Sequence, residues 1–600
     1  MKQFITFLFT LLLIITIACS PTEPQQQVES EVNTSVIKKP DDKNQQIIVK
    51  EKDKAKPSEP YLAKKQLLEE HIHAQRRNEL SDAIAPQSVV AMEYAMGTAR
   101  TPSVSLDSIR HPSEPLNREN YAVIDDNPIK RVLEHPVSTF SIDVDTGSYA
   151  NVRRFLKAGN LPVQDAVRAE ELINYFSYDY PLPEDQRVPF SLIREIAPTP
   201  WNPDTYLLHI GIQGYDVAPE QLPASNLVFL VDISGSMQSP DKLGLLKNSL
   251  KLLTNHLDKN DRISMVVYAG GTGVVLQPTA GDQKATINAA IDQLTAGGRT
   301  NGAAGIKLAY AMAEQGFIRN GINRVLLATD GDFNVGTTNI EQLKDLIEEK
   351  RKTGIALSTL GFGTGNYNDY LMEQLADNGN GNYAYIDTLS EAQKVLVDEM
   401  SSTLLTIAKD VKIQIEFNPE LVEEYRLIGY ENRLLNREDF NNDKIDAGEI
   451  GAGHTVTALY EVALKGKGGA KMDPLRYQSE ESVKTGKQDE LAFLRLRYKE
   501  PGASKSRLLE WPIKRHEIVA DINRTSDAFR FSAAVAMFAQ QLRGGKYTGQ
   551  ASYDDTLALA SGARGQDPFG YHGEFLTLVN LAKSLSSKAH ESDQVADSTR

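Results

Sequence analysis

Oxygen-bearing side chains follow a buried apolar run near the middle of this 600-residue chain. The run Leu227–Val231 leads directly into Asp232, Ser234 and Ser236, which occupy alternate positions. Such a run, ending in small polar residues, predicts a buried parallel strand with a loop at its carboxyl end, where open α/β sheets bind ligands. One carboxylate and two hydroxyls are hard ligands, and they suit Mg²⁺ better than Zn²⁺.

Two further oxygen donors lie in separate segments. Thr300 stands in the turn-rich stretch 297–302 (GGRTNG), and Asp330 ends a second apolar run that begins at Arg324. The sequence therefore predicts a site for magnesium, with manganese or calcium as alternatives, built from five residues: Asp232, Ser234, Ser236, Thr300 and Asp330. The alternative interpretation is that these residues end strands and cap helices, as Ser and Asp commonly do.

This three-part pattern resembles the metal-ion-dependent adhesion site of von Willebrand factor type A domains. All five positions match that pattern in order. The resemblance implies that Ser234, Ser236 and Thr300 bind the ion through hydroxyls, and that Asp232 and Asp330 reach it directly or through water. It also implies that an open coordination position accepts an acidic side chain of a protein partner.

Residues 222–408 alternate apolar runs with helical periodicity, which predicts a doubly wound, mostly parallel α/β sheet. The predicted strands are 227–231, 262–268, 274–276, 324–328, 355–362 and 383–386. The predicted helices are 242–257, 284–294, 302–315, 340–353, 368–378 and 389–405.

The flanking regions have a different period. Strands are predicted at 139–144, 190–196, 206–213, 411–417, 425–430, 455–464, 490–498 and 508–513, and helices at 149–156, 166–176, 525–542 and 572–584. Because strand-rich pieces lie on both sides of the α/β unit, we expect that unit to be inserted into one β-rich domain with a C-terminal helical part. Such an insertion requires the two ends of the α/β unit to be close.

The N-terminal segment has the features of an export signal. Lys2 precedes the apolar core Phe4–Ile17, which is short for a spanning helix. Ala18 and Cys19, the only cysteine in the chain, follow this core. This arrangement resembles a bacterial lipoprotein signal, although Thr16 stands where that family usually has Leu; an ordinary signal peptide is the alternative. The resemblance implies lipidation of Cys19, anchorage in the cell envelope and, because Ser20 follows, a preference for the outer membrane.

Composition limits the partners of this chain. The formal net charge is -15, which argues against nucleic acid as a ligand. Residues 20–115 are rich in Gln, Lys, Glu, Pro and Ser, and are predicted to form a disordered tether with an end-to-end distance of about 50–60 Å. The predicted organisation is a signal peptide (1–19), the tether (20–115), an N-terminal flanking region (116–221), the α/β domain (222–408), a C-terminal β-rich then helical region (409–585) and a polar tail (586–600).

Two other motifs resemble functional sites, one catalytic and one calcium-binding. Asp145-Thr146-Gly147-Ser148 matches the catalytic turn of aspartic proteases, but a second such turn is absent from the sequence, and a strand end with a helix cap is the simpler interpretation. The acidic stretch 439–449 suggests a calcium loop, but Lys444 stands where an EF-hand needs Gly, which favours a solvated acidic loop. The chain has neither a P-loop nor a His-Glu-x-x-His motif.

The arrangement resembles a bacterial family of lipoproteins that carry a von Willebrand factor A domain between characteristic flanking regions. The resemblance rests on three segments, 141–149 (SIDVDTGSY), 170–176 (EELINYF) and 436–453 (NREDFNNDKIDAGEIGAG). We therefore expect a lipid-anchored envelope protein, not an enzyme, that binds a protein partner in adhesion or assembly. The alternatives are an envelope hydrolase and a purely structural envelope component that uses the domain for docking.

Overall fold

The structure is a computed structural model. It describes residues 119–598 apart from residues 186, 219–220, 299–301, 332–339, 474 and 477–485. The predicted signal, Cys19 and the predicted tether therefore lie outside the described residues. Among the described helices, none combines the length and the apolar character that crossing a bilayer requires.

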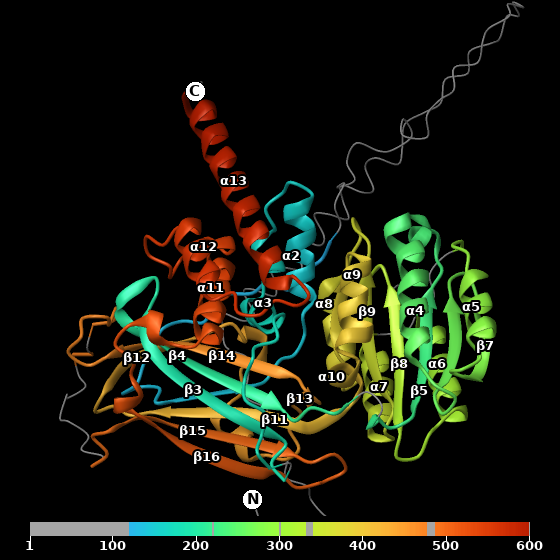
Figure 1. Cartoon of the computed structure of the whole chain (residues 1–600), viewed down its shortest axis with the longest axis horizontal. Helices are drawn as coiled ribbons and strands as arrows, with labels where there is room; N and C mark the ends of the chain where they lie inside the picture. The colour runs from blue at the N-terminus through green and yellow to red at the C-terminus, as the bar shows by residue number, and fades with distance from the viewer. Residues whose placement is uncertain are drawn as a thin grey trace, which may run out of the picture. The chain divides into compact units, whose positions relative to one another are not determined.

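The α/β domain contains a six-stranded sheet in the order β10-β9-β8-β5-β6-β7 (Figure 1). All pairs in it are parallel except β6 with β7. The predicted mostly parallel, doubly wound sheet is thus confirmed. The strands are β5 (Ser225–Asp232), β6 (Arg262–Tyr268), β7 (Thr272–Ala280), β8 (Ile322–Thr329), β9 (Ala356–Phe362) and β10 (Tyr383–Ile386).

Helices cover both faces of this sheet, since its strands are apolar on both sides. One buried cluster joins α4 and α5 to the sheet, and another joins α6, α7 and α8 to the opposite face. The helices are α4 (Leu245–His256), α5 (Lys284–Asp292), α6 (Gly302–Gln315), α7 (Ile340–Lys352), α8 (Asp369–Asn378), α9 (Leu389–Gln393) and α10 (Met400–Leu404).

Two predicted helices of this domain differ from the structure. The helix predicted from Lys242 begins with one wide π turn, Pro240–Gly244, before α4. The helix predicted over 389–405 is divided, because a second π turn (Lys394–Asp398) separates α9 from α10. Hydrophobic periodicity does not distinguish a π turn from an α turn, so neither π turn can be predicted from it.

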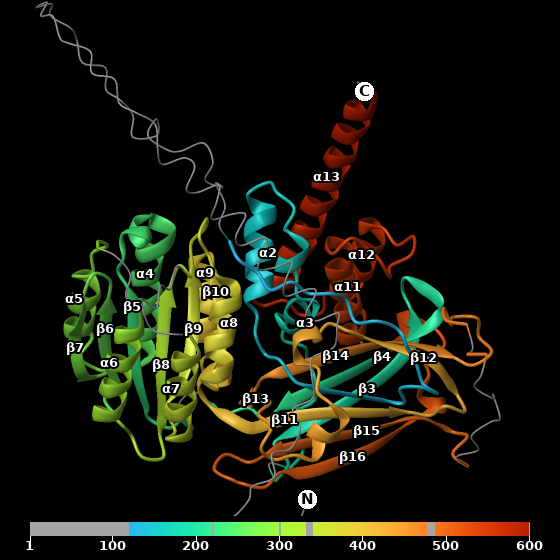
Figure 2. The same cartoon turned by 180° about the vertical axis from the view of Figure 1, so that it is seen from behind.

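Strands from both sides of the α/β domain pair with one another, which confirms the predicted insertion (Figure 2). β4 pairs antiparallel with β14, and β2 with β11. We call the resulting unit the flanking domain. Its strands are β1 (Lys130–Arg131), β2 (Val137–Ser141), β3 (Phe190–Thr199), β4 (Asn202–Gly214), β11 (Thr406–Phe417), β12 (Val422–Ile428), β13 (Gly448–Gly451), β14 (Thr455–Leu464), β15 (Glu490–Lys499) and β16 (Arg507–Lys514). The sequence did not predict β1 and β13, which are short.

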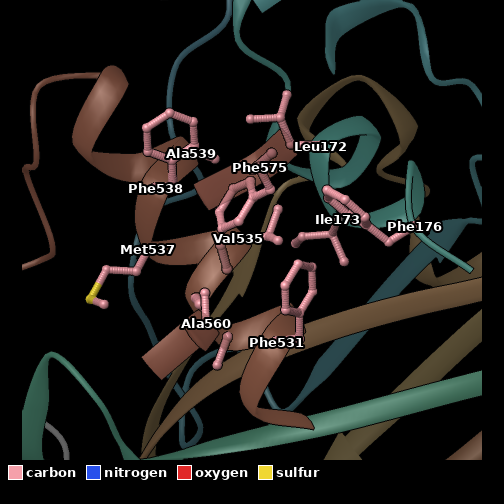
Figure 3. Packing of buried hydrophobic residues seen from close by; sticks show 14 of the residues in the cluster. Leu172, Ile173, Phe176, Phe531, Val535, Met537, Phe538, Ala539, Ala560 and Phe575 are labelled. Atoms are coloured by element: carbon pink, nitrogen blue, oxygen red, sulfur yellow. The ribbon is translucent and has the colours of Figure 1, made fainter. Parts of the chain in front are cut away.

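Helices of the flanking domain pack together in an aromatic cluster (Figure 3). Phe176 meets Phe531 and Phe575 edge to face, and Phe531 is tilted against Phe575, with ring centroids 5.0–5.7 Å apart. The helices are α2 (Gly147–Lys157), α3 (Ala169–Asn174), α11 (Asp527–Leu542), α12 (Tyr553–Ser561) and α13 (Tyr571–Ser598). The predicted helix over 166–176 is thus shorter, α12 was not predicted, and α13 continues beyond its predicted end at Ser584.

Candidate metal site and interdomain seam

Asp232 and Asp330 leave the sheet at the same edge. β5 and β8 are parallel neighbours, with Val231 opposite Ala328, so the residues that follow them are close. Both aspartates are fully buried. Their proximity also appears in the electrostatics, because the charge of Asp330 contributes to raising the pKa of Asp232.

Three donors fix the carboxylate of Asp232. The backbone N–H of Ser234 donates to Oδ1 at 2.8 Å, and the hydroxyls of Thr329 and Tyr268 donate to Oδ2 at 2.9 and 3.2 Å. Burial raises the pKa of Asp232 to about 6, more than these hydrogen bonds lower it. A buried carboxylate held in one orientation beside a second carboxylate is an arrangement that a cation stabilises.

The serine hydroxyls and the glycine-rich loop lie beside this carboxylate. The Oγ atoms of Ser234 and Ser236 are 2.9 Å apart. The N–H of Gly297 donates to the carbonyl of Ile233, and the N–H of Gly235 donates to the carbonyl of Gly298. The structure thus brings the start of the stretch 297–302 against the aspartate–serine loop. Thr300 itself lies outside the described residues.

A lysine that the sequence analysis did not identify contacts Asp330. Lys242 Nζ lies 2.9 Å from Asp330 Oδ2 and 3.2 Å from Asn366 Oδ1. The amide of Asn366 also donates to Asp330 Oδ2, at 3.3 Å. Lys242 stands ten residues after Asp232 at a predicted helix start, and no feature of that position distinguishes it from a surface lysine.

The donors at this edge fit a hard divalent cation. Two carboxylates and two hydroxyls from Asp232, Asp330, Ser234 and Ser236 offer the oxygen ligands that Mg²⁺ prefers. Tyr268 and Thr329 belong to the supporting layer that orients such ligands. Sequence reasoning missed both, although Thr329 directly precedes Asp330.

The residues of the protease-like turn, 145–148, make structural contacts. Asp145 Oδ1 accepts the backbone N–H of Tyr383 at 2.7 Å, and its Oδ2 accepts from Arg433 at 3.2 Å. Thr146 is the N-cap residue of α2 but makes no side-chain capping bond, so the expected local cap is absent there. Ser148 does accept a backbone N–H, but that of Arg168, which precedes α3. Asp145 therefore fastens the flanking domain to β10 of the α/β domain.

The acidic stretch 439–449 also makes structural contacts. Asp446 pairs with Arg351, and Glu449 accepts from Asn380, both in the α/β domain. Asp443 accepts from the hydroxyl and the N–H of Ser506. These carboxylates therefore have partners on neighbouring elements.

Three arginines of the flanking domain, of which Arg153 and Arg168 are buried, bind carboxylates of the α/β domain. We call this boundary the interdomain seam. Arg153 binds Asp387 and Glu391, Arg168 binds Asp369, and Arg433 binds Glu373 and Asp377.

One group of three carboxylates in this seam, among the described residues, is compact enough to surround a cation: Asp143, Glu171 and Glu373. Each already has a charged partner, since Arg433 pairs with Asp143 and Glu373, and Arg168 with Glu171. Burial raises the pKa of Glu373 to about 8 and also raises that of Glu171. We interpret the group as part of the ion-pair network of the seam.

Comparison with known proteins identifies the family. A relative from Escherichia coli K12, described as "Uncharacterized protein YfbK", is 50% identical over 473 residues, which cover 78% of this chain and 81% of that protein. The chain belongs to the YfbK family. The family model for the YfbK C-terminal region matches residues 402–585, and the models for von Willebrand factor and its type A domain match 115–209 and 226–399. The α/β domain of this YfbK relative is thus a von Willebrand factor A domain, hereafter the VWA domain.

More distant similarities cover smaller parts of the chain or have lower identity. Inter-alpha-trypsin inhibitor heavy chain H3 from Pongo abelii is 26% identical over 281 residues, which cover 42% of this chain and 31% of that protein. A solved structure described as von Willebrand factor type A from Catenulispora acidiphila aligns with 67% of this chain and 91% of its own, at 14% identity and a TM-score of 0.37.

Proposed function

We propose that this chain is an exported, lipid-anchored envelope protein whose VWA domain binds an acidic side chain of a protein partner through a divalent cation, magnesium in the first place. The observation that carries the proposal is the carboxylate of Asp232, buried and held by three donors beside Asp330. VWA domains serve protein–protein interaction or adhesion, and this edge of the sheet is where such binding would occur.

Each residue has a specific role in this proposal. Ser234, Ser236 and Thr300 would hold the ion through hydroxyls, while Thr329 and Tyr268 keep Asp232 oriented. The bound ion would supply a Lewis-acidic position for a carboxylate from the partner. A charge-assisted contact of this kind is strong and directional, so it selects acidic side chains over amides.

The test is capture of envelope proteins by the full chain in the presence of Mg²⁺ or of EDTA. We expect capture with Mg²⁺, loss of capture with EDTA, and loss in Asp232→Ala even with Mg²⁺. Asp292→Ala is the matched control, because Asp292 is an exposed aspartate of the same domain that pairs with Lys251. Circular dichroism checks that both variants fold. Capture that survives both EDTA and Asp232→Ala would contradict the proposal.

The lipid anchor has a separate test. Cys19 would carry the acyl chains, and the segment 20–115 would hold the folded domains away from the membrane. Wild-type chain should incorporate labelled palmitate and sediment with membranes, whereas Cys19→Ser should do neither. Incorporation of label by Cys19→Ser would show that the anchor is elsewhere.

A structural envelope role is the second candidate, and the interdomain seam favours it. Buried Arg–carboxylate pairs hold the VWA domain against the flanking domain, as expected for a rigid scaffold. In this role, partners would bind with equal strength in Mg²⁺ and EDTA. The capture experiment above therefore distinguishes the two candidates.

A further inference from the structure

Lys242 places a positive charge at the proposed metal edge. Its ammonium donates to Asp330 Oδ2 at 2.9 Å and to Asn366 Oδ1 at 3.2 Å, and Asn366 Nδ2 donates to the same Asp330 oxygen at 3.3 Å. The Lys242 side chain is 8% exposed and that of Asp330 is fully buried. The pair is therefore largely shielded from water. In such a shielded environment an ion pair interacts more strongly than at the surface.

The local backbone is built to position this lysine. Lys242 lies in the π turn Pro240–Gly244, which begins at a proline and precedes α4. Its methylene groups pack against Gly363, where an added Cβ would lie 2.2 Å from Cε of Lys242. Gly363 has a φ of +73°, a conformation that glycine adopts without strain. A side chain at position 363 would therefore collide with Lys242 in this position.

The charges at this edge suggest what the lysine does. The two aspartates carry two negative charges, and Lys242 offsets one of them. A divalent cation entering beside Asp232 meets repulsion from the ammonium and finds one oxygen of Asp330 already engaged. When the cation is bound, one positive charge remains in excess, and this favours a carboxylate as the next ligand.

We propose that the ammonium of Lys242 forms an ion pair with Asp330 beside the metal site. This ion pair lowers the affinity of the site for a divalent metal until an acidic partner binds. This inference rests on the proposed metal site. It assigns Asp330 to contact the ion through water, with Asp232 and the hydroxyls nearest to it. Lys242 is a positioning residue, and its role predicts a change in metal affinity that is independent of partner capture.

The experiment is titration of the full chain with Mn²⁺, followed by electron paramagnetic resonance of the free ion. Lys242→Met removes the charge, and we expect it to bind Mn²⁺ at least about tenfold more tightly than wild type. Lys242→Arg keeps the charge and should bind no more tightly than wild type. Lys251→Met is the matched control, since Lys251 lies on α4 and pairs with Asp292 instead.

The outcomes separate this inference from the proposed function. The inference is supported if Lys242→Met binds Mn²⁺ more tightly than wild type while Lys242→Arg and Lys251→Met do not. This includes the case in which wild type binds no detectable Mn²⁺. If wild type binds Mn²⁺ and Lys242→Met binds with equal or lower affinity, the role of Lys242 is wrong while the metal site stands. If neither binds, the proposed function fails, and this inference with it. Lys242→Gln, neutral but able to bond Asp330, replaces Lys242→Met if the latter does not fold.

Discussion

Arg168 and Asp369 form a fully buried ion pair across the interdomain seam. Arg168 directly precedes α3 of the flanking domain, and Asp369 is the first residue of α8 in the VWA domain; Nη1 and Oδ2 are 2.5 Å apart. Arg168 also binds Glu171, so one guanidinium forms ion pairs with two buried carboxylates. The pair couples the helix that supports the VWA sheet to the domain into which it is inserted.

Removing this guanidinium should be costly. Arg168→Ala leaves Asp369 and Glu171 buried without their partner, and breaking a buried pair in this way costs about 3–5 kcal/mol. We expect the free energy of unfolding, measured with urea, to fall by about this amount. Arg187→Ala is the control, since Arg187 is exposed and pairs with exposed Asp185, and such a surface ion pair contributes little to stability. A loss below about 1 kcal/mol in Arg168→Ala would show that the seam relaxes or hydrates.

Much of the VWA domain follows from local patterns, because its strands are continuous apolar runs and its helices amphipathic. The edge formed by Asp232 and Asp330 follows as well, since parallel neighbours end together. The positions of Lys242 and Asn366 do not follow, because they depend on a π turn and on a loop that returns from β9. The contacts of the interdomain seam could not be predicted from the sequence either. The sequence predicts that Asp145 ends a strand beside a helix cap, whereas its partners Tyr383 and Arg433 lie 238 and 288 residues away.

Thr329 should affect metal binding without being a ligand. Its hydroxyl donates to Asp232 Oδ2, and Thr329→Val keeps the shape of the side chain while removing that donor. Loss of a supporting hydrogen bond typically lowers metal affinity about 10- to 100-fold. Mn²⁺ titration of the full chain measures this. Thr279→Val is the control, since Thr279 bonds the carbonyl of Gln277 away from this edge. Unchanged affinity in Thr329→Val would place the ion, if bound, away from Asp232.

Gly147 should tolerate no side chain. At this first residue of α2, an added Cβ would lie 2.2 Å from the ring of Tyr383, on β10. Tyr383 is itself fixed, since its hydroxyl accepts from Tyr367 and donates to Asp369. We expect Gly147→Ala to lower the free energy of unfolding by about 1–3 kcal/mol, the usual cost of overpacking.

Gly244→Ala provides the comparison for Gly147. Gly244 has helical backbone angles and open space at its Cβ position, so alanine should stabilise the protein by about 0.4–1 kcal/mol. Both variants are measured by thermal and urea unfolding. Equal stability of the two variants would mean that α2 shifts away from β10 without cost.

His209 should make stability depend on pH. The side chain is fully buried in the flanking domain; Nε2 lies 2.9 Å from the hydroxyl of Tyr180, and Nδ1 has no hydrogen-bond partner among the described residues. Burial lowers the pKa of His209 from 6.5 to about 3. The unfolded chain therefore takes up a proton below about pH 6.5 that the folded chain takes up only near pH 3.

The sign and size of this effect follow from linkage. The contribution of His209 is fully present above pH 6.5 and is lost as pH falls, by about 1.4 kcal/mol per pH unit, down to about pH 3. Between pH 7 and pH 5 the wild type should lose about 2 kcal/mol more than His209→Gln, which has no titrating group at this position. Urea unfolding at both values measures the difference, with exposed His256→Gln as the control that should follow the wild type. Parallel pH profiles for wild type and His209→Gln would mean that the imidazole is protonated in the folded protein, with an acceptor for its second N–H.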